Sequence, residues 1–144
     1  MSELVIAPAS ASEVIFVYDS WIKGWRTSRW AGCIPNNVFH QTTKDAIHQL
    51  LTRGANLHVA RSGGRALGWL CHEATEDGRL VVHAAYVKSA YRGFPVLDAL
   101  VAHACADGAT CPGFYTYRTD FLERGLRDLN KGPWTHAPEI ARRK

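Results

Sequence analysis

The sequence predicts a single domain of the mixed α/β (α+β) class, in which helices flank a mostly antiparallel central sheet. Three observations lead to this prediction. The chain has 144 residues, which is the length of one globular domain. Hydrophobic residues make up 47% of it and charged residues 21%, a balance that builds a packed core and excludes a disordered or collagen-like chain. Its apolar spacing changes between strand and helix periods in the order β-α-α-β-β-β-α-β-α.

The N-terminal part of the chain is predicted to form a short strand followed by two helices. Leu4, Val5 and Ile6 are consecutive apolar residues, a pattern typical of a strand. Ser10 and Glu13 have the spacing of a capping box, and apolar residues recur at helical spacing after them. The predicted ranges are 4–6 for the strand, about 10–26 and 36–54 for the helices, and 31–35 for the loop between them.

The rest of the chain is predicted to add four strands and two helices. Turns at 62–65 and 76–78 separate three strand patterns, and the third pattern is apolar on both faces apart from His83. Pro95 suits the first position of a helix, and Thr119 suits the cap of another. The predicted strands are 57–60, 66–73, 80–87 and 113–117, and the last helix is expected to end at Gly132 and Pro133, before a ragged, basic C-terminus.

Charge, cysteines and hydropathy exclude several classes of protein. Seventeen Lys and Arg against thirteen Asp and Glu give a net charge of +4, which suits an anionic partner without choosing one. None of the four cysteines forms a Cys-x-x-Cys pair, so we expect no metal site. No stretch approaches the ~18 apolar residues of a membrane span, and the N-terminus lacks the pattern of a signal peptide, so we expect a cytoplasmic protein.

Residues 81–97 are the segment most informative about function. They comprise a buried strand, a short basic loop with a glycine, and the start of an apolar helix. At such a junction, backbone N–H groups and the positive end of the helix dipole favour a phosphate. Arg92 adds a fixed positive charge, and Lys88 is placed to add another. The alternative is an ordinary strand-to-helix connection with solvated charges.

This segment resembles the cofactor loop of the GNAT N-acetyltransferase superfamily. In that family a strand ends in a valine and leads into an Arg/Gln-x-x-Gly-x-Gly/Ala turn, which is similar to Tyr86-Val87-Lys88 followed by Tyr91-Arg92-Gly93. The order of elements matches over nearly the whole chain, and the small GNAT-like proteins of tailed bacteriophages look most similar. The resemblance implies a GNAT-like fold, acetyl-CoA without a metal, and transfer of the acetyl group to a small-molecule or protein amine.

The resemblance also implies which residues hold acetyl-CoA. Arg92 and the turn after it would bind the pyrophosphate, and the backbone at the end of the strand would pair with the pantetheine amides. The implied cofactor-binding residues are Ala85, Tyr86, Val87, Lys88, Arg92, Gly93, Phe94 and Val96.

The sequence departs from the family pattern at three positions. Pro95 stands where the family has its first glycine, so one N–H donor is lost; a hydrogen bond to a charged group contributes ~1.5–3 kcal/mol, or roughly ten- to a hundredfold in affinity. Leu97 adds bulk where the family keeps the backbone open. Asp128 stands where many members carry a tyrosine as general acid, and an aspartate is a poor proton donor at neutral pH.

His83 and Glu73 are the candidate catalytic residues. Acetyl transfer to an amine needs a group that accepts the ammonium proton, and His83 is the polar side chain of its strand, expected on the same side as Val81, Ala85 and Val87. Glu73 ends the neighbouring predicted strand. The alternative for His83 is a core histidine that is bonded to a backbone group.

Two functions follow from these residues. The first is an acetyl-CoA-dependent N-acetyltransferase in which His83 or a water accepts the proton. The second is an inactive GNAT-fold phage protein, in the virion or the host cytoplasm, that binds a protein partner or takes part in virion assembly; Pro95, Leu97 and Asp128 favour it. Nucleic acid is disfavoured as a partner because the positive charge is dispersed along the chain.

Overall fold

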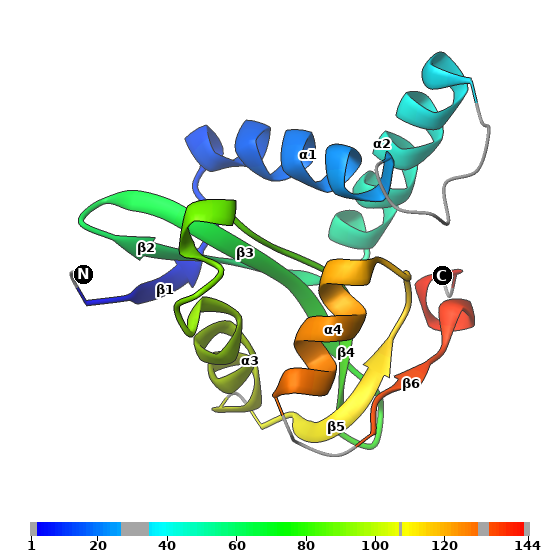
Figure 1. Cartoon of the computed structure of the whole chain (residues 1–144). Helices are drawn as coiled ribbons and strands as arrows, with labels where there is room; N and C mark the ends of the chain where they lie inside the picture. The colour runs from blue at the N-terminus through cyan, green and yellow to red at the C-terminus, as the bar shows by residue number, and fades with distance from the viewer. Residues whose placement is uncertain (1–2, 27–34, 107, 130–132, 143–144) are drawn as a thin grey trace.

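The computed structural model describes residues 3–26, 35–106, 108–129 and 133–142. Figure 1 shows a central sheet with helices on both of its faces. The elements are β1 (Val5–Pro8), α1 (Ala11–Arg26), α2 (Asn36–Thr52), β2 (Asn56–Ser62), β3 (Arg65–Ala74), β4 (Arg79–Val87), the 3-10 turn η1 (Ser89–Tyr91), α3 (Val96–Ala106), β5 (Thr110–Tyr115), α4 (Asp120–Asp128), β6 (Thr135–His136) and the 3-10 turn η2 (Pro138–Arg142).

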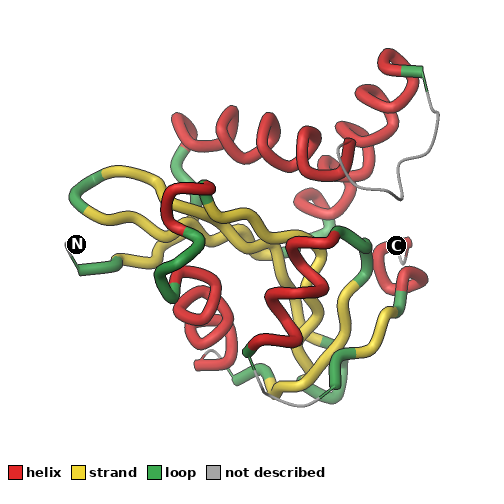
Figure 2. Tube along the Cα trace, viewed as in Figure 1, coloured by secondary structure: helices red, strands yellow, loops and turns green. Residues whose placement is uncertain are grey.

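The six strands lie in the sheet in their sequence order, from β1 to β6. Neighbours are antiparallel from β1 to β4, whereas β4, β5 and β6 run parallel to one another. Parallel neighbours need a crossover connection, and α3 and α4 provide the two crossovers (Figure 2). The predicted fold class is therefore confirmed: a mixed, mostly antiparallel sheet with helices around it.

Two cores lie on opposite faces of the sheet. One core contains the buried sides of α3 and α4, including Leu100 and Leu122, packed on Leu70 and Val82. The other contains the buried sides of α1 and α2, packed on residues that include Val59, Trp69, Cys71 and Ala84. None of the described helices is both long and apolar enough to cross a lipid bilayer.

The C-terminal boundaries differ from the predicted ones. Residues 135–136 pair with β5 and residues 138–142 form η2, so the chain has regular structure up to residue 142, where a ragged end was predicted. The last two residues of the predicted basic tail lie outside the described residues. A two-residue strand has too little periodicity to be recognised in a sequence. Helix α4 ends at Asp128, earlier than predicted, and Pro95 precedes α3, because its carbonyl accepts the first helical hydrogen bond, from Ala99. The predicted loop at 31–35 lies outside the described residues except for Pro35.

The Glu13 half of the predicted capping box is present at the start of α1, and Glu13 is also joined to the sheet. The backbone N–H of Ser10 donates to Glu13 Oε1 at 2.9 Å, and the N–H of Glu13 donates to the Ser10 carbonyl at 3.0 Å. Glu13 also pairs with Arg61 of β2. The hydrogen bond from Arg61 lowers the pKa of Glu13 and the bonds from Ser10 add to this, although burial opposes them.

Replacing Glu13 with glutamine is expected to lower the free energy of unfolding by ~1 kcal/mol at pH 7. Because the folded pKa of Glu13 is lowered, its contribution is present above the unfolded value of about 4.3 and is lost as the pH falls below it. Urea titrations at pH 7 and pH 3 check this, with Glu3→Gln at an exposed position as the control. A deficit of the same size at both pH values would contradict the expectation.

A β-bulge interrupts β4 at His83. Val82 pairs with His72 and Ala84 pairs with Cys71, so His83 is one extra residue in its strand. The bulge shifts the alternation of side chains. Residues 82, 85 and 87 all face the core under α3 and α4, whereas Ala84 faces α1 and α2. The prediction that His83 shares a side with Ala85 and Val87 is therefore wrong, because it assumed an unbroken period of two.

Glycines allow the close contacts of β4 with both neighbouring strands. A Cβ atom on Gly68 of β3 would overlap the Tyr86 carbonyl, and one on Gly113 of β5 would overlap the Leu80 carbonyl. In both cases the obstacle is backbone, which cannot turn aside as a flexible side chain can. These two glycines set how closely β3 and β5 approach β4.

Candidate functional site

Strands β4 and β5 separate after a short paired stretch. Their last pair is Val82 with Tyr115, followed by a hydrogen bond of 3.1 Å from the Thr116 N–H to the Val82 carbonyl. Beyond it, β4 continues to Val87, while the chain after β5 turns toward α4. The two strands are therefore apart from the bulge at His83 onward.

The separation leaves one edge of β4 without a neighbouring strand. The Lys88 N–H donates to the Leu67 carbonyl of β3 at 2.9 Å, so alternation turns the backbone groups of Ala85 and Val87 toward the open side. The Val87 carbonyl accepts a hydrogen bond of 2.9 Å from Arg92 Nε. The amides of Ala85 and Val87 and the carbonyl of Ala85 thus face the gap.

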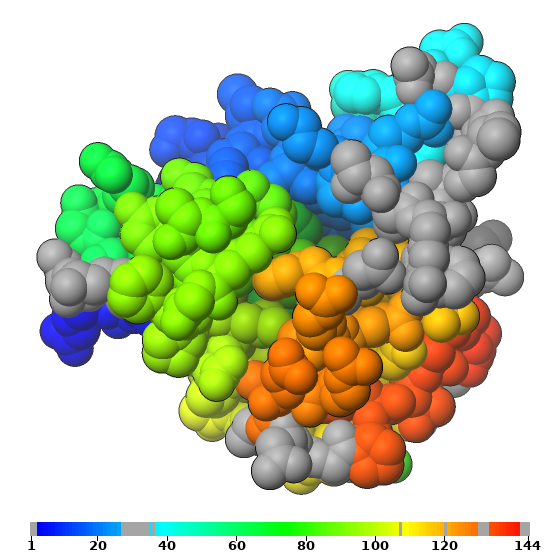
Figure 3. Space-filling model, viewed as in Figure 1, coloured from blue at the N-terminus to red at the C-terminus, as the bar shows by residue number. Residues whose placement is uncertain are grey.

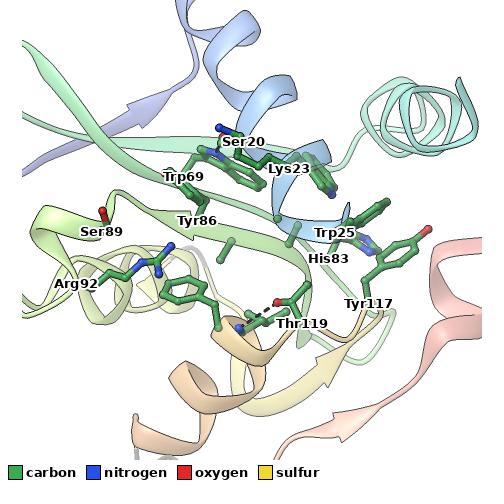
Figure 4. Close-up of a pocket in the computed structure, with 16 residues that line it drawn as sticks. Ser20, Lys23, Trp25, Trp69, His83, Tyr86, Ser89, Arg92, Tyr117 and Thr119 are labelled. Carbon is green, nitrogen blue, oxygen red and sulfur yellow. Dashed lines mark hydrogen bonds between the residues drawn. The ribbon is translucent and has the colours of Figure 1, made fainter. Parts of the chain in front are cut away.

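A pocket of about 350 Å³ fills this gap, within the usual range of small-molecule sites. Figure 3 shows the surfaces of α1, of the η1–α3 segment and of α4 meeting around this region. Figure 4 shows Ser89 and Arg92 at one end of the pocket and Trp25 and Tyr117 at the other. The first pocket is lined by Ser20, Trp21, Lys23, Gly24, Trp25, Trp69, His83, Ala84, Ala85, Tyr86, Ser89, Arg92, Tyr117, Thr119, Phe121 and Leu122.

Arg92 lies where the first pocket meets a second one. Its guanidinium carbon is 4.9 Å from the centre of the Phe121 ring and 5.8 Å from that of Tyr86. No described residue accepts a hydrogen bond from its terminal nitrogens, Nη1 and Nη2. The second pocket, of about 430 Å³, is lined by Val87, Arg92, Phe94, Leu97, Asp98, Phe121, Arg124, Gly125 and Asp128. The two pockets share Arg92 and Phe121, so an extended molecule can occupy both.

The turn after Arg92 uses some of its amides internally. The Phe94 N–H donates to the Tyr91 carbonyl at 3.1 Å, and the Val96 N–H donates to the Phe94 carbonyl at 2.8 Å. Within the described ranges, the N–H groups of Gly93 and Leu97 donate to no protein atom. The turn therefore offers Gly93 and Leu97 as donors to an anion, rather than Phe94 and Val96 as the sequence suggested.

Solved structures of other proteins share this fold. A GCN5-related N-acetyltransferase from Ralstonia eutropha matches with a TM-score of 0.65 at 15% identity, over 91% of this chain and 94% of that one. An aminoglycoside 6′-N-acetyltransferase from Acinetobacter haemolyticus matches with a TM-score of 0.57 at 18% identity, over 90% and 91%. The PaiA N-acetyltransferase from Thermoplasma acidophilum, solved with coenzyme A, matches with a TM-score of 0.52 at 11% identity, over 73% and 71%.

The chain has the GNAT acetyltransferase fold. No protein-family model matches the sequence, and no curated protein does. The three structures above come from bacteria and an archaeon, so the similarity to phage proteins is still only a prediction.

Two departures from the GNAT loop pattern have clear structural outcomes. Leu97 is only 8% exposed and lies against Gly125 of α4, where a Cβ atom would overlap it. Its bulk therefore fills the space between α3 and α4 rather than the turn itself. Asp128, at the position of the family's tyrosine, lines the second pocket and not the first.

Lys88 lines neither pocket, whereas Phe94 shares the second pocket with Arg92. The Lys88 Nζ lies 5.1 Å from the centre of the Phe16 ring on α1. The Phe94 side chain is 48% exposed and lines the second pocket only. Phe94 therefore does not fill the first pocket, which is open beside Ala85.

His83 and Glu73 do meet, in a buried network behind the first pocket. His83 is fully buried; its Nδ1 is 2.7 Å from Thr116 Oγ1 and its Nε2 is 3.4 Å from Glu73 Oε1. Arg53 donates to Glu73 at 2.6 Å and to the carbonyls of Ile140 and Ala141 in η2. The partners of His83 are thus side chains, and not the backbone group that the alternative interpretation expected.

The charges of this network determine the state of Glu73. Burial raises the pKa of Glu73, but the hydrogen bond from His83 and the positive charges of His83 and Arg53 outweigh it, so the pKa is lowered overall. Glu73 is therefore ionised at neutral pH. Among the described residues, no group of three or more His, Cys, Asp or Glu side chains could hold a metal ion.

Several residues of the first pocket had no role assigned from the sequence, among them Trp25, Trp69 and Tyr117. Trp25 has the helical spacing of a core residue, and it does pack on Trp21. It also packs on Tyr117, from the loop after β5. The feature of the sequence that could have identified Tyr117 is its position shortly after β5, the strand that separates from β4. It becomes informative only once that separation is known.

Proposed function

We propose that the protein is an acetyl-CoA-dependent N-acetyltransferase that acts on a primary amine. The observation that carries this proposal is the first pocket, which lies against the unpaired edge of β4 and ends at Arg92. A GNAT fold alone would not suffice, because catalysis also needs an open path to the strand edge. The pocket supplies that path.

The residues present fit acetyl-CoA. Ala85 and Val87 have backbone groups that would pair with amides of the pantetheine arm, as a neighbouring strand would. Arg92, with the N–H groups of Gly93 and Leu97 at the start of α3, would hold the pyrophosphate. Arg124 lines the second pocket together with Arg92 and adds a second positive charge there. When bound, acetyl-CoA supplies a thioester whose carbonyl carbon an amine can attack.

The chain's own part in the reaction is to bind the amine and to accept its proton. In our proposal His83 donates from Nε2 to Glu73, so its Nδ1 accepts from the Thr116 hydroxyl. A proton from the amine would pass through water and the Thr116 hydroxyl to Nδ1. The ionised Glu73 would stabilise the imidazolium that forms. His83 and Glu73 thus retain the catalytic roles that the sequence suggested, with Thr116 as the relay.

An inactive GNAT-fold protein that binds a protein partner, or assembles into a virion, is the second candidate. Pro95 favours it, because with the internal bonds of Phe94 and Val96 it leaves few amides for a pyrophosphate. The open first pocket argues against it, since a protein without a ligand has no reason to keep that cavity.

Calorimetric titration with acetyl-CoA tests the proposal. We expect binding with a Kd on the order of 10 μM, weakened at least tenfold in Arg92→Ala, because one charge-assisted contact contributes ~1.5–3 kcal/mol. Arg65→Ala, at the exposed start of β3, is the matched control and is expected to bind as the wild type does. If the folded protein releases no heat at millimolar acetyl-CoA, the enzyme proposal fails and the second candidate takes its place.

A further inference from the structure

Five aromatic residues that line the first pocket form a continuous row, which we name the aromatic row. Figure 4 labels four of them: Tyr86, Trp69, Trp25 and Tyr117. The members of the row come from β4, β3, α1 and the loop after β5. Successive ring centres are 6.5, 5.0, 5.5 and 4.1 Å apart in the order Tyr86, Trp69, Trp21, Trp25 and Tyr117. Each ring is thus in contact with the next, and together they form one apolar wall.

The aromatic row is held in place by hydrogen bonds and packing. Trp69 Nε1 donates to Ser20 Oγ at 2.8 Å, and Ser20 Oγ donates to the Phe16 carbonyl at 2.7 Å. Trp21 and Trp69 are almost completely buried, whereas Trp25 and Tyr117 are half-buried at the open end of the row. A preorganised wall of this kind binds a flat apolar group without a large loss of side-chain entropy.

The charge of the first pocket is positive. Its described lining includes Lys23 and Arg92 but no Asp or Glu. Glu73, the acid nearest to His83, is bonded to Arg53 behind the pocket. A substrate with several positive charges would therefore meet no carboxylate among the described residues of this lining.

A single ammonium group is suited to this pocket in two ways. The face of an aromatic ring attracts a cation by ~0.5–2 kcal/mol, so the half-buried rings can hold one ammonium group without a carboxylate. The positive charge of Lys23, which lines the same pocket, lowers the pKa of a nearby amine and so favours the neutral form that attacks a thioester.

We propose that the acceptor is a monoamine with an aromatic or flat apolar body, bound along the aromatic row. The proposal rests on the proposed function. The amine nitrogen forms a bond to the acetyl carbon while the carbon–sulfur bond breaks. The products are one amide and one coenzyme A thiol per turnover, and the proton lost by the nitrogen balances the one that the thiolate takes up.

Release of the coenzyme A thiol, followed with a thiol reagent, tests the proposal on four amines. Tryptamine and 2-phenylethylamine are the aromatic monoamines, and spermidine and neamine are the polycations. We expect kcat/KM to be at least tenfold higher for tryptamine than for either polycation. Trp25→Ala is expected to lower kcat/KM for tryptamine by about tenfold, since an aromatic contact contributes ~1.5 kcal/mol. Trp134→Phe, outside both pockets, is the matched control.

Two calorimetric titrations separate this proposal from the proposed function. Acetyl-CoA is titrated into the wild type and Trp25→Ala, and both are expected to bind it equally. In a second titration without cofactor, 2-phenylethylamine is expected to bind and spermidine is not. If acetyl-CoA binds but spermidine or neamine is the better substrate, or no aromatic amine reacts, the acceptor class is wrong and the proposed function stands. If acetyl-CoA does not bind, both fail.

Discussion

Replacing Gly113 with alanine is expected to lower the free energy of unfolding by ~3 kcal/mol or more, and the melting temperature by roughly 10 °C. A Cβ atom at this position would overlap the backbone carbonyl of Leu80 in β4. Strand β5 would have to move away from β4 along the few residues over which they pair. The same movement would widen the first pocket, so the expected loss of stability comes with a loss of acetyl-CoA affinity.

Thermal unfolding followed by circular dichroism checks this expectation. Gly24→Ala is the matched control, because a Cβ atom there has no neighbour within 4 Å and the residue lies inside α1. That substitution is expected to raise the unfolding free energy by ~0.5–1 kcal/mol. Equal stability of Gly113→Ala and the wild type would mean that β5 does not approach β4 as closely as described.

Replacing Arg53 with glutamine is expected to lower the free energy of unfolding by ~2 kcal/mol at pH 7. Arg53 connects the end of α2 to Glu73 of β3 and to the carbonyls of Ile140 and Ala141. Its removal leaves the Glu73 carboxylate, with only 22% of its side chain exposed, beside His83 without its main partner. η2 also loses its attachment to α2.

The pH dependence of the free energy of unfolding shows whether the loss comes from the Arg53–Glu73 ion pair or from the packing of the Arg53 side chain. The folded pKa of Glu73 is lowered, so its contribution to stability is present above the unfolded value of about 4.3 and is lost as the pH falls through the folded value. Without Arg53 the pKa of Glu73 rises, and this loss becomes smaller. Urea titrations between pH 5 and pH 3 should therefore show a steeper decline for the wild type than for Arg53→Gln. Arg65→Gln serves as the control, and parallel declines in wild type and Arg53→Gln would refute the ion-pair explanation.

Local patterns allowed most of the fold to be predicted. The capping box, the helical stripes and the three central strands all depend on residues close together in the sequence, and they lie close to where the patterns put them. The β-bulge could not be predicted, because one extra residue in β4 is invisible until the pairing with β3 is known. Strand β6 and η2 carry too few residues to show a period.

The candidate site was predictable in part, for the same reason. Arg92 and the end of β4 are neighbours in the sequence, so the turn between them could be placed in advance. The aromatic row could not, because Trp25, Trp69 and Tyr117 come from three distant segments and meet only through the tertiary fold. The N–H donors of the turn after Arg92 could not be predicted either. Hydrogen bonds within the turn use some of its N–H groups, and only the structure shows which ones stay available to an anion.

The order of strands in the sheet also bears on how the molecule folds. Strands β2, β3 and β4 follow one another through tight turns, so their pairing closes only short loops and costs little chain entropy. Strand β5 reaches β4 only after the crossover through α3, and the residues after it complete the first pocket. The site thus lies between two parts of the chain: strands β2 to β4, which we expect to pair early in folding, and the segment from β5 onward, which we expect to pack against them later. A chain can therefore have its central strands fully formed and still have no pocket.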